Sequence, residues 1–202
     1  MRLMTSIPRG LPAGCLMTAM LPFGPCAAQG APGFHPAGAA GRVCLAVRAR
    51  AQQVGQPAAD IKGVDQNGAA ADLAQFKGKV ILLDVSTMWC VWCQVDAPAL
   101  ENLYNTYSNK GLKVVTCLTE DSNGAAVTLA GLKQWAGTYH LTTPVMNDAS
   151  GTSNGVAESA YVSASGGFPT LVLIDKSFNV QYLAGGLDLP AVTAKIQALL
   201  AQ

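Results

Sequence analysis

Two cysteines set three residues apart, in Trp89-Cys90-Val91-Trp92-Cys93, have the spacing that redox chemistry requires. In a helix, residues three positions apart lie about one turn apart, so the second thiol can reach the sulfur of the first. The first thiolate can attack a partner disulfide, and the second thiol can resolve the mixed disulfide or close an internal one. The spacing therefore predicts reversible thiol–disulfide exchange, with Cys90 as the exposed nucleophile and Cys93 as the resolving thiol.

The surrounding sequence predicts that Cys90 lies where a buried strand gives way to a helix. Residues 80–85 form a short, continuous apolar run, which is typical of a strand buried on both faces. After Cys93, apolar side chains recur at helical spacing, at Leu100, Leu103, Tyr104 and Tyr107. A helix N-terminus has unpaired N–H groups and a partial positive charge, which lower a cysteine pKa from about 8.5 toward 7. At pH 7 this shift raises the reactive thiolate fraction more than about tenfold.

Further elements are predicted by the same patterns. Asn67-Gly68 indicates a two-residue hairpin turn between strands at 61–65 and 69–71, and Asp72 can cap a short helical turn, 72–76. The other predicted strands cover residues 112–119, 170–175 and 180–183. Predicted helices run from Cys93 to Lys110-Gly111 and over 126–140 and 189–201, with core candidates Leu129, Leu132, Trp135, Val192, Ile196, Leu199 and Leu200. This order predicts an α/β fold with a mixed central β-sheet flanked by helices.

The first 56 residues do not share these patterns, and we expect the folded domain to cover residues 57–202. Residues 1–28 combine two arginines, a modest apolar stretch and the sequence Cys26-Ala27-Ala28. This pattern resembles a secretory signal peptide and predicts a periplasmic or secreted protein, although prolines interrupt the apolar stretch and a disordered leader is the alternative. Residues 29–56 are rich in Ala, Gly and Pro, which is typical of a linker. Membrane anchoring is expected only through the leader.

The charge balance argues against two classes of partner. The chain has 13 basic and 12 acidic side chains, so its net charge is +1. A chain this close to neutrality gives no electrostatic reason to expect nucleic acid or an anionic membrane surface as a partner.

Hydrophobic residues make up 50% of the 202 residues, which is enough to build a substantial core.

Further motifs stand at fixed distances from the cysteine pair. Asp84 lies six residues before Cys90, and Pro98 lies eight residues after it. Phe168-Pro169-Thr170 immediately precedes a predicted core strand. With Trp89-Cys90-x-x-Cys93, the 65–68 hairpin and the 120–144 insertion, these features resemble the thioredoxin superfamily, over about residues 59–202. Within it they are similar to the TlpA/ResA-like, redoxin-type branch of bacterial extracytoplasmic oxidoreductases.

The resemblance implies a thioredoxin-like fold with an extra N-terminal hairpin and a central insertion. It implies a protein thiol–disulfide oxidoreductase that needs no metal or organic cofactor and exchanges disulfides with redox partner proteins. Asp84 would be a buried acid, its pKa raised by desolvation, that takes the proton of Cys93. A cis peptide bond before Pro169 would expose the backbone of Phe168, so that a bound substrate segment could pair like an added strand. Trp89 and Trp92 complete the expected substrate-binding residues.

The residues alone leave other readings open. Thr87 lies three residues before the first cysteine, as in peroxiredoxins, although Leu83 stands where that family has a proline. A non-catalytic, thiol-based copper carrier would usually enlist His or Met, and Met88 is the only such neighbour. A structural zinc site needs four ligands, and there is no second cysteine pair. Asp84 could be a satisfied core polar group, and Cys117 is expected to be a structural core residue.

Overall fold

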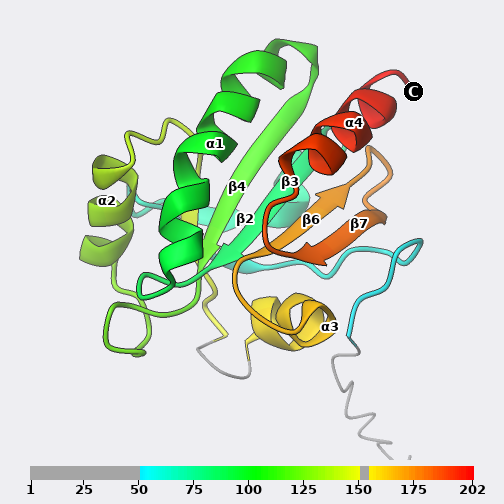
Figure 1. Ribbon diagram of the computed structural model, residues 1–202. Helices are drawn as coiled ribbons and strands as arrows, with labels where there is room; N and C mark the ends of the chain where they lie inside the picture. Colours follow the sequence, from blue (N-terminus) through cyan, green and yellow to red (C-terminus); the bar gives the residue numbers. More distant parts are fainter. Residues whose placement is uncertain (1–50, 151–154) are drawn as a thin grey trace, which may run out of the picture. The chain divides into compact units, whose positions relative to one another are not determined.

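The computed structural model describes residues 51–150 and 155–202 (Figure 1). The predicted signal peptide and most of the predicted linker lie outside the described residues, as do Cys15, Cys26 and Cys44. Within the described part, no helix is both long enough and apolar enough to cross a membrane.

A five-stranded mixed sheet forms the centre of the fold, in the order β5-β4-β3-β6-β7. The central strand β3 runs parallel to β4 and antiparallel to β6. Every residue of β3 is buried, as its continuous apolar sequence predicts for a strand covered on both faces. The strands are β3 (Val80–Ser86), β4 (Leu112–Leu118), β5 (Val145–Asn147), β6 (Thr170–Ile174) and β7 (Val180–Gly185).

Two helices, α1 (Val91–Tyr107) and α4 (Leu189–Leu200), cover one face of the sheet (Figure 1). α1 ends in a short 3-10 turn, η2 (Ser108–Lys110), and Gly111 then takes a left-handed conformation with φ +107°, as expected of a residue that ends a helix. Tyr104 and Leu200 are half-buried, and the other predicted core residues of these helices are buried: Leu100, Leu103, Tyr107, Val192, Ile196 and Leu199.

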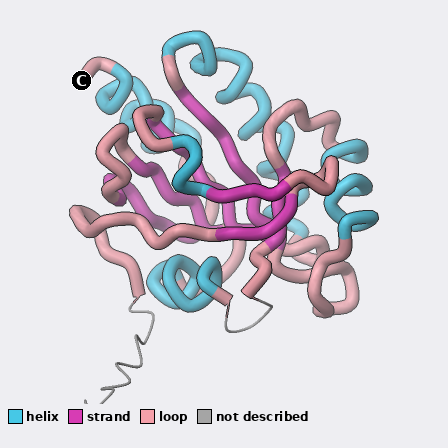
Figure 2. Tube along the Cα trace, turned by 180° about the vertical axis from the view of Figure 1, so that it is seen from behind, coloured by secondary structure: helices cyan, strands magenta, loops and turns pink. Residues whose placement is uncertain are grey.

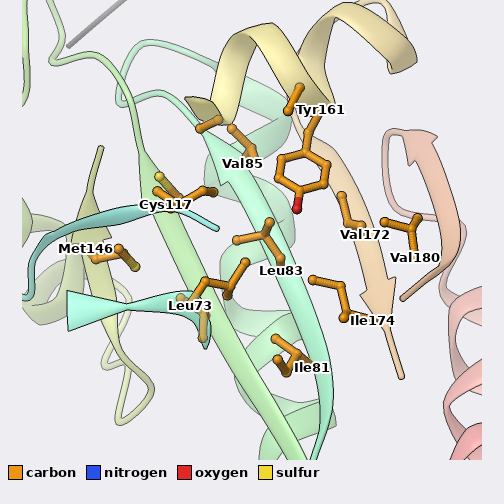
Figure 3. Packing of buried hydrophobic residues seen from close by; sticks show 14 of the residues in the cluster. Leu73, Ile81, Leu83, Val85, Cys117, Met146, Tyr161, Val172, Ile174 and Val180 are labelled. Atoms are coloured by element: carbon orange, nitrogen blue, oxygen red, sulfur yellow. The ribbon is translucent and has the colours of Figure 1, made fainter. Parts of the chain in front are cut away.

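The opposite face is covered by the N-terminal hairpin and by short helical segments, which Figure 2 shows from behind. Leu73 and Tyr161 from these segments pack against Ile81, Leu83 and Val172 of the sheet (Figure 3). The segments are β1 (Lys62–Val64), β2 (Ala70–Asp72), the 3-10 helix η1 (Leu73–Phe76), the π-helix η3 (Ala157–Val162) and α3 (Ser163–Ser165).

The hairpin pairs as predicted, but its turn is longer than two residues. β1 and β2 are antiparallel with Val64 opposite Ala70, so five residues connect them. The Asp65 carboxylate accepts the backbone N–H groups of Asn67 and Ala69, both at 2.8 Å. Gly68 has a positive φ of +82°, whereas Asn67 does not. The prediction of a two-residue turn was therefore wrong, because the Asp65 side chain stabilises a wider loop.

The insertion helix α2 (Leu129–Thr138) is shorter than the predicted 126–140. Thr128 caps its N-terminus, since its hydroxyl accepts the N–H of Gly131 at 3.2 Å. Leu132 and Trp135 are buried, as expected. Leu129 was wrongly predicted to be a core residue: it is 38% exposed and lies beside the hairpin turn.

Three elements were absent from the sequence-based prediction: β5, the π-helix η3 and the short α3 that continues it. β5 has only three residues and pairs with the end of β4, so it is too short for a recognisable periodicity. The π-helix η3 has a wider turn than an α-helix, so its buried residues do not follow the 3.6-residue spacing.

The folded domain begins before residue 57. The backbone N–H of Gln52 donates to the carbonyl of Ala160, and that of Gly55 donates to Val180, both at 2.7 Å. The last residues of the predicted linker therefore belong to the domain. The sequence-based boundary missed them because it rested on composition, which carries no information on backbone hydrogen bonds of this kind.

Two leucines of α2 give a matched test of how this helix packs. We expect Leu132→Ala to lower the free energy of unfolding by about 2–5 kcal/mol, because Leu132 is fully buried beside Met88 and Cys93. Leu129→Ala should cost under about 1 kcal/mol, because that side chain is partly exposed. Urea unfolding of the disulfide-bonded protein, followed by circular dichroism, measures both. Equal losses in the two variants would contradict this packing.

Candidate active site

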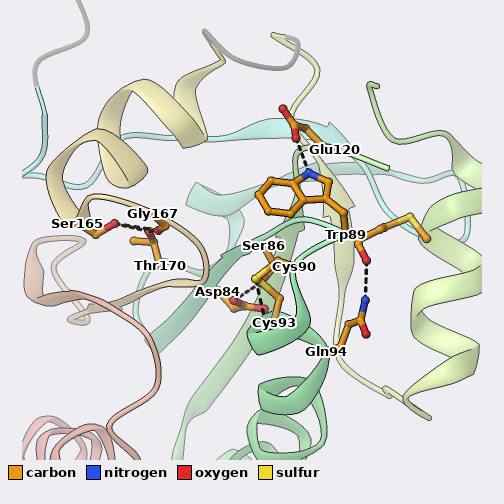
Figure 4. The surroundings of a disulfide bond; sticks show 11 residues. Asp84, Ser86, Trp89, Cys90, Cys93, Gln94, Glu120, Ser165, Gly167 and Thr170 are labelled. Carbon is orange, nitrogen blue, oxygen red and sulfur yellow. Dashed lines mark hydrogen bonds between the residues drawn. A yellow bond between two sulfur atoms is a disulfide. The ribbon is translucent and has the colours of Figure 1, made fainter. Parts of the chain in front are cut away.

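Cys90 and Cys93 lie at the junction between β3 and α1, as the sequence predicts, and they are joined by a disulfide bond (Figure 4). Their Cα atoms are 5.3 Å apart. Cys90 is the N-cap of α1, and its sulfur accepts the backbone N–H of Cys93 at 3.2 Å. The first sulfur of the pair is thus held at a helix N-terminus, where N–H groups and the helix dipole favour a thiolate.

Both cysteines are buried in this disulfide-bonded state. Cys90 is 5% exposed and Cys93 is 1% exposed. The expectation that Cys90 is an exposed residue is therefore wrong for this state, although Cys90 is the more accessible of the two. The reason is its packing in an apolar cluster that includes Met88, Val127 and Phe168.

The surface around the disulfide is apolar and open. Four large hydrophobic side chains from the start of α1 and the residue before Cys90 are 48–69% exposed: Trp89, Val91, Trp92 and Val95. Of the other described residues, only Val54, Leu129 and Leu189 are large, apolar and comparably exposed. A cluster of exposed apolar side chains is typical of a surface that binds another protein.

Asp84 lies on β3 among the residues that surround the disulfide (Figure 4). One carboxylate oxygen accepts the Ser86 hydroxyl at 2.6 Å, and the other has no hydrogen-bond partner among the described residues. Burial raises the pKa of Asp84 to about 7, partly opposed by the nearby hydroxyls of Ser86 and Thr116 and reinforced by the charge of Asp96. The predicted rise in pKa is confirmed. The reading of Asp84 as a satisfied core group does not fit its unpaired oxygen.

The Phe168–Pro169 peptide bond is cis, as predicted, and it directly precedes β6. The ring of Phe168 meets that of Trp89 edge to face, with centroids 5.9 Å apart. Beside this loop lies a cavity of about 340 Å³, lined by Trp92, Val95, Asp96, Phe168, Pro169, Gly186 and Leu187. The structure therefore brings Trp89, Trp92, Phe168 and Pro169 together at one edge of the sheet, next to the cysteine pair.

Two residues of this site were missed by sequence reasoning. Glu120 follows β4, and its carboxylate accepts the indole N–H of Trp89 at 2.6 Å. Asp96 lines the cavity beside Pro169, and burial raises its pKa. The available signal for Glu120 was its place just after a buried strand, because neighbouring parallel strands end at the same edge of a sheet.

Other features of the described residues lie away from this chemistry. A larger cavity, of about 530 Å³, lies between the end of α1 and α4 and is lined by no cysteine. Cys117 on β4 is buried outside any disulfide, and burial raises its thiol pKa well above the ordinary value, in keeping with a structural residue. Within residues 51–150 and 155–202, no three His, Cys, Asp or Glu side chains gather as metal ligands would.

Comparison with known proteins places this geometry in a family. The Redoxin family model matches residues 53–194. The thiol-disulfide oxidoreductase ResA of Bacillus thuringiensis (strain Al Hakam) is 30% identical over 128 residues, which cover 63% of this chain and 67% of that protein. Other curated relatives are matched over 54% to 70% of their own length.

Solved structures share the fold. The thioredoxin domain of a thiol-disulfide oxidoreductase from Bacteroides vulgatus superposes with a TM-score of 0.61 at 23% identity, covering 72% of this chain and 99% of that domain. A secreted disulfide oxidoreductase of Mycobacterium tuberculosis, homologous to DsbE of E. coli, superposes with a TM-score of 0.52 at 17% identity, covering 68% of this chain and 95% of that one. With its close cysteine pair, this chain belongs to the Redoxin family and is a thiol–disulfide oxidoreductase with a thioredoxin-like fold.

Proposed function

We propose that this protein exchanges disulfides with partner proteins outside the cytoplasm, through Cys90 and Cys93. The observation that carries the proposal is a disulfide at a helix N-terminus, set in an open apolar surface beside the Phe168–Pro169 loop. A small-molecule disulfide would need only enough space to reach the sulfur of Cys90, and no large contact surface around it. The exposed side chains of Trp89 and Trp92 offer instead the apolar contact area that a protein partner would bury.

Cys90 is the attacking residue in this proposal. In the reduced protein its thiolate attacks one sulfur of the partner disulfide, and the other partner sulfur leaves as a thiolate. Cys93 then attacks Cys90 in the mixed disulfide, which frees the partner's second thiol and closes the Cys90–Cys93 bond. Two electrons pass to the partner, and the same steps in reverse oxidise a partner dithiol.

Asp84 takes the proton that Cys93 loses in the second step. Its pKa of about 7 lets the carboxylate accept a proton near neutral pH, and its unpaired oxygen is free to do so. The cavity lined by Trp92, Phe168 and Pro169 would hold the partner segment next to the sulfur.

Location outside the cytoplasm has three supports. The pattern of residues 1–28 resembles a secretory signal peptide. A protein of the same fold, the disulfide oxidoreductase of M. tuberculosis, is secreted. Stable disulfides also form in oxidising compartments, where a protein of this chemistry finds its substrates.

Replacing one cysteine at a time tests the assigned roles. We expect Cys93→Ser to accumulate covalent mixed disulfides with partner proteins, because nothing then resolves the bond that Cys90 forms. Cys90→Ser should trap none, because the attacking thiolate is lost. Non-reducing electrophoresis after acid quenching measures both. Trapping through Cys93 alone would reverse the assignment.

The same variants separate this function from a peroxidase. Wild-type protein should reduce insulin disulfides with dithiothreitol as the electron source, and it should consume hydroperoxide slowly. Fast hydroperoxide turnover that survives Cys93→Ser would favour a peroxiredoxin-like enzyme instead.

A further prediction concerns the pH dependence of exchange in Asp84→Asn. Below about pH 6 the wild-type carboxyl is already largely protonated, so the two proteins should react at similar rates there. At higher pH the variant should be slower, by about a hundredfold near pH 7–8, because it has no carboxylate to take the proton of Cys93. Stopped-flow oxidation of the reduced protein gives the profile. An unchanged curve would leave Asp84 with a packing role.

A control checks separately that Asp84 is buried and has a raised pKa: the free energy of unfolding of the disulfide-bonded protein is measured against pH. The pKa of Asp84 is raised from 3.8 in the unfolded chain to about 7 in the fold, so the wild-type protein should lose stability as pH rises through that window. The Asp84→Asn variant lacks this slope, whereas Asp188→Asn, at the exposed cap of α4, should keep it.

A further inference from the structure

The indole of Trp89 is half-exposed and yet held on two sides. Its N–H donates to the Glu120 carboxylate at 2.6 Å, and its ring meets Phe168 edge to face, with the ring planes 88° apart (Figure 4 shows the contact with Glu120). An exposed tryptophan next to a reactive sulfur would otherwise sample several rotamers. These contacts fix one of them.

Glu120 is itself set firmly in place. Its carbonyl accepts the N–H of Met88 at 2.9 Å, and the preceding N–H, of Thr119, donates to Ser86 at 3.0 Å. It also forms an antiparallel bridge with Ala126 across the loop. Within the described residues, the salt bridges all involve Lys62, so no cation competes with the indole for this carboxylate. The loop after β4 thus holds an acceptor at a fixed point beside the cysteine pair.

We propose that Glu120 is a positioning residue that selects for protein partners by fixing Trp89 beside the disulfide. In this orientation the rings of Trp89 and Phe168 form one continuous aromatic wall at the edge of the sheet, against which a partner segment packs as its disulfide reaches Cys90. The inference rests on the proposed function, since it concerns how that same site receives a protein.

Such a role makes a specific demand on the chemistry of residue 120. The hydrogen bond needs an acceptor for the indole N–H, and a glutamine carbonyl can serve as well as a carboxylate. It does not need the negative charge. The wall should also matter more for a protein than for a small disulfide, because a small molecule makes few contacts beyond the sulfur.

The experiment compares second-order rate constants for oxidation of the reduced protein by insulin and by glutathione disulfide. We expect Glu120→Ala to slow the reaction with insulin about tenfold and to change that with glutathione disulfide less than about twofold. Glu120→Gln should keep the rate with insulin within about twofold of the wild type. Ser122→Ala, an exposed residue of the same loop, is the control and should change neither rate.

A double-mutant cycle tests whether Glu120 acts through Trp89. Trp89→Phe keeps an aromatic ring but removes the N–H, so it should slow insulin oxidation much as Glu120→Ala does. Adding Glu120→Ala to Trp89→Phe should then have no further effect, because the hydrogen bond is already lost. The equilibrium with reduced and oxidised glutathione should stay unchanged in all variants, since none alters the cysteine pair itself.

Three results would overturn the proposal. Equal losses in Glu120→Gln and Glu120→Ala would show that charge, not the hydrogen bond, matters. Equal losses with insulin and glutathione disulfide would place the effect on the cysteines rather than on partner docking. Additive effects in the double mutant would uncouple Glu120 from Trp89. A wild-type protein inactive toward both substrates would instead contradict the proposed function, and the positioning role with it.

Discussion

The site depends on one junction, where the central strand leaves the core and α1 begins. β3 is buried on both faces, so the chain leaves the core where this strand ends, at the edge of the sheet. It then turns into α1, which packs on the face of the sheet that α4 also covers. The first free backbone N–H groups of α1 therefore point at residue 90. A sulfur at that position accepts one of them, from Cys93, and lies in the field of the helix N-terminus. In the proposed reaction, this placement stabilises the thiolate of Cys90.

The rest of the site comes from the order of the strands. β4 runs parallel to β3 on one side and ends beside it, which puts Glu120 at the same edge. β6 runs antiparallel on the other side and begins at that edge, which puts the Phe168–Pro169 loop there as well. Trp89 lies between these two loops and contacts both. Segments separated by tens of residues in the sequence thus form one surface because the sheet aligns their ends.

Much of this arrangement could be predicted from the sequence, because it depends on strong local signals. The continuous apolar run of β3, the helical spacing after Cys93 and the cysteine spacing itself each correspond to what the structure contains. The resemblance to the thioredoxin superfamily supplied the cis bond before Pro169. The features that escaped prediction depend on contacts across the fold: the pairing of β5, the Glu120–Trp89 hydrogen bond and the burial of Cys90. The turn at Asp65 escaped because a side-chain acceptor, not the Asn67-Gly68 pair, determines its length.

Ionisation of Cys90 in the reduced protein is the most direct test of this account. The rate at which iodoacetamide alkylates Cys90 in the Cys93→Ser variant, measured against pH on the Cys90 peptide by mass spectrometry so that Cys15, Cys26 and Cys44 do not contribute, reports the pKa of that thiol, because the thiolate is the reacting form. Cys117 is buried and should stay unlabelled, which mass spectrometry of the alkylated protein can check. A helix N-terminus that stabilises the thiolate predicts a midpoint near pH 7 or lower. A midpoint near the ordinary value of about 8.5 would contradict the central claim.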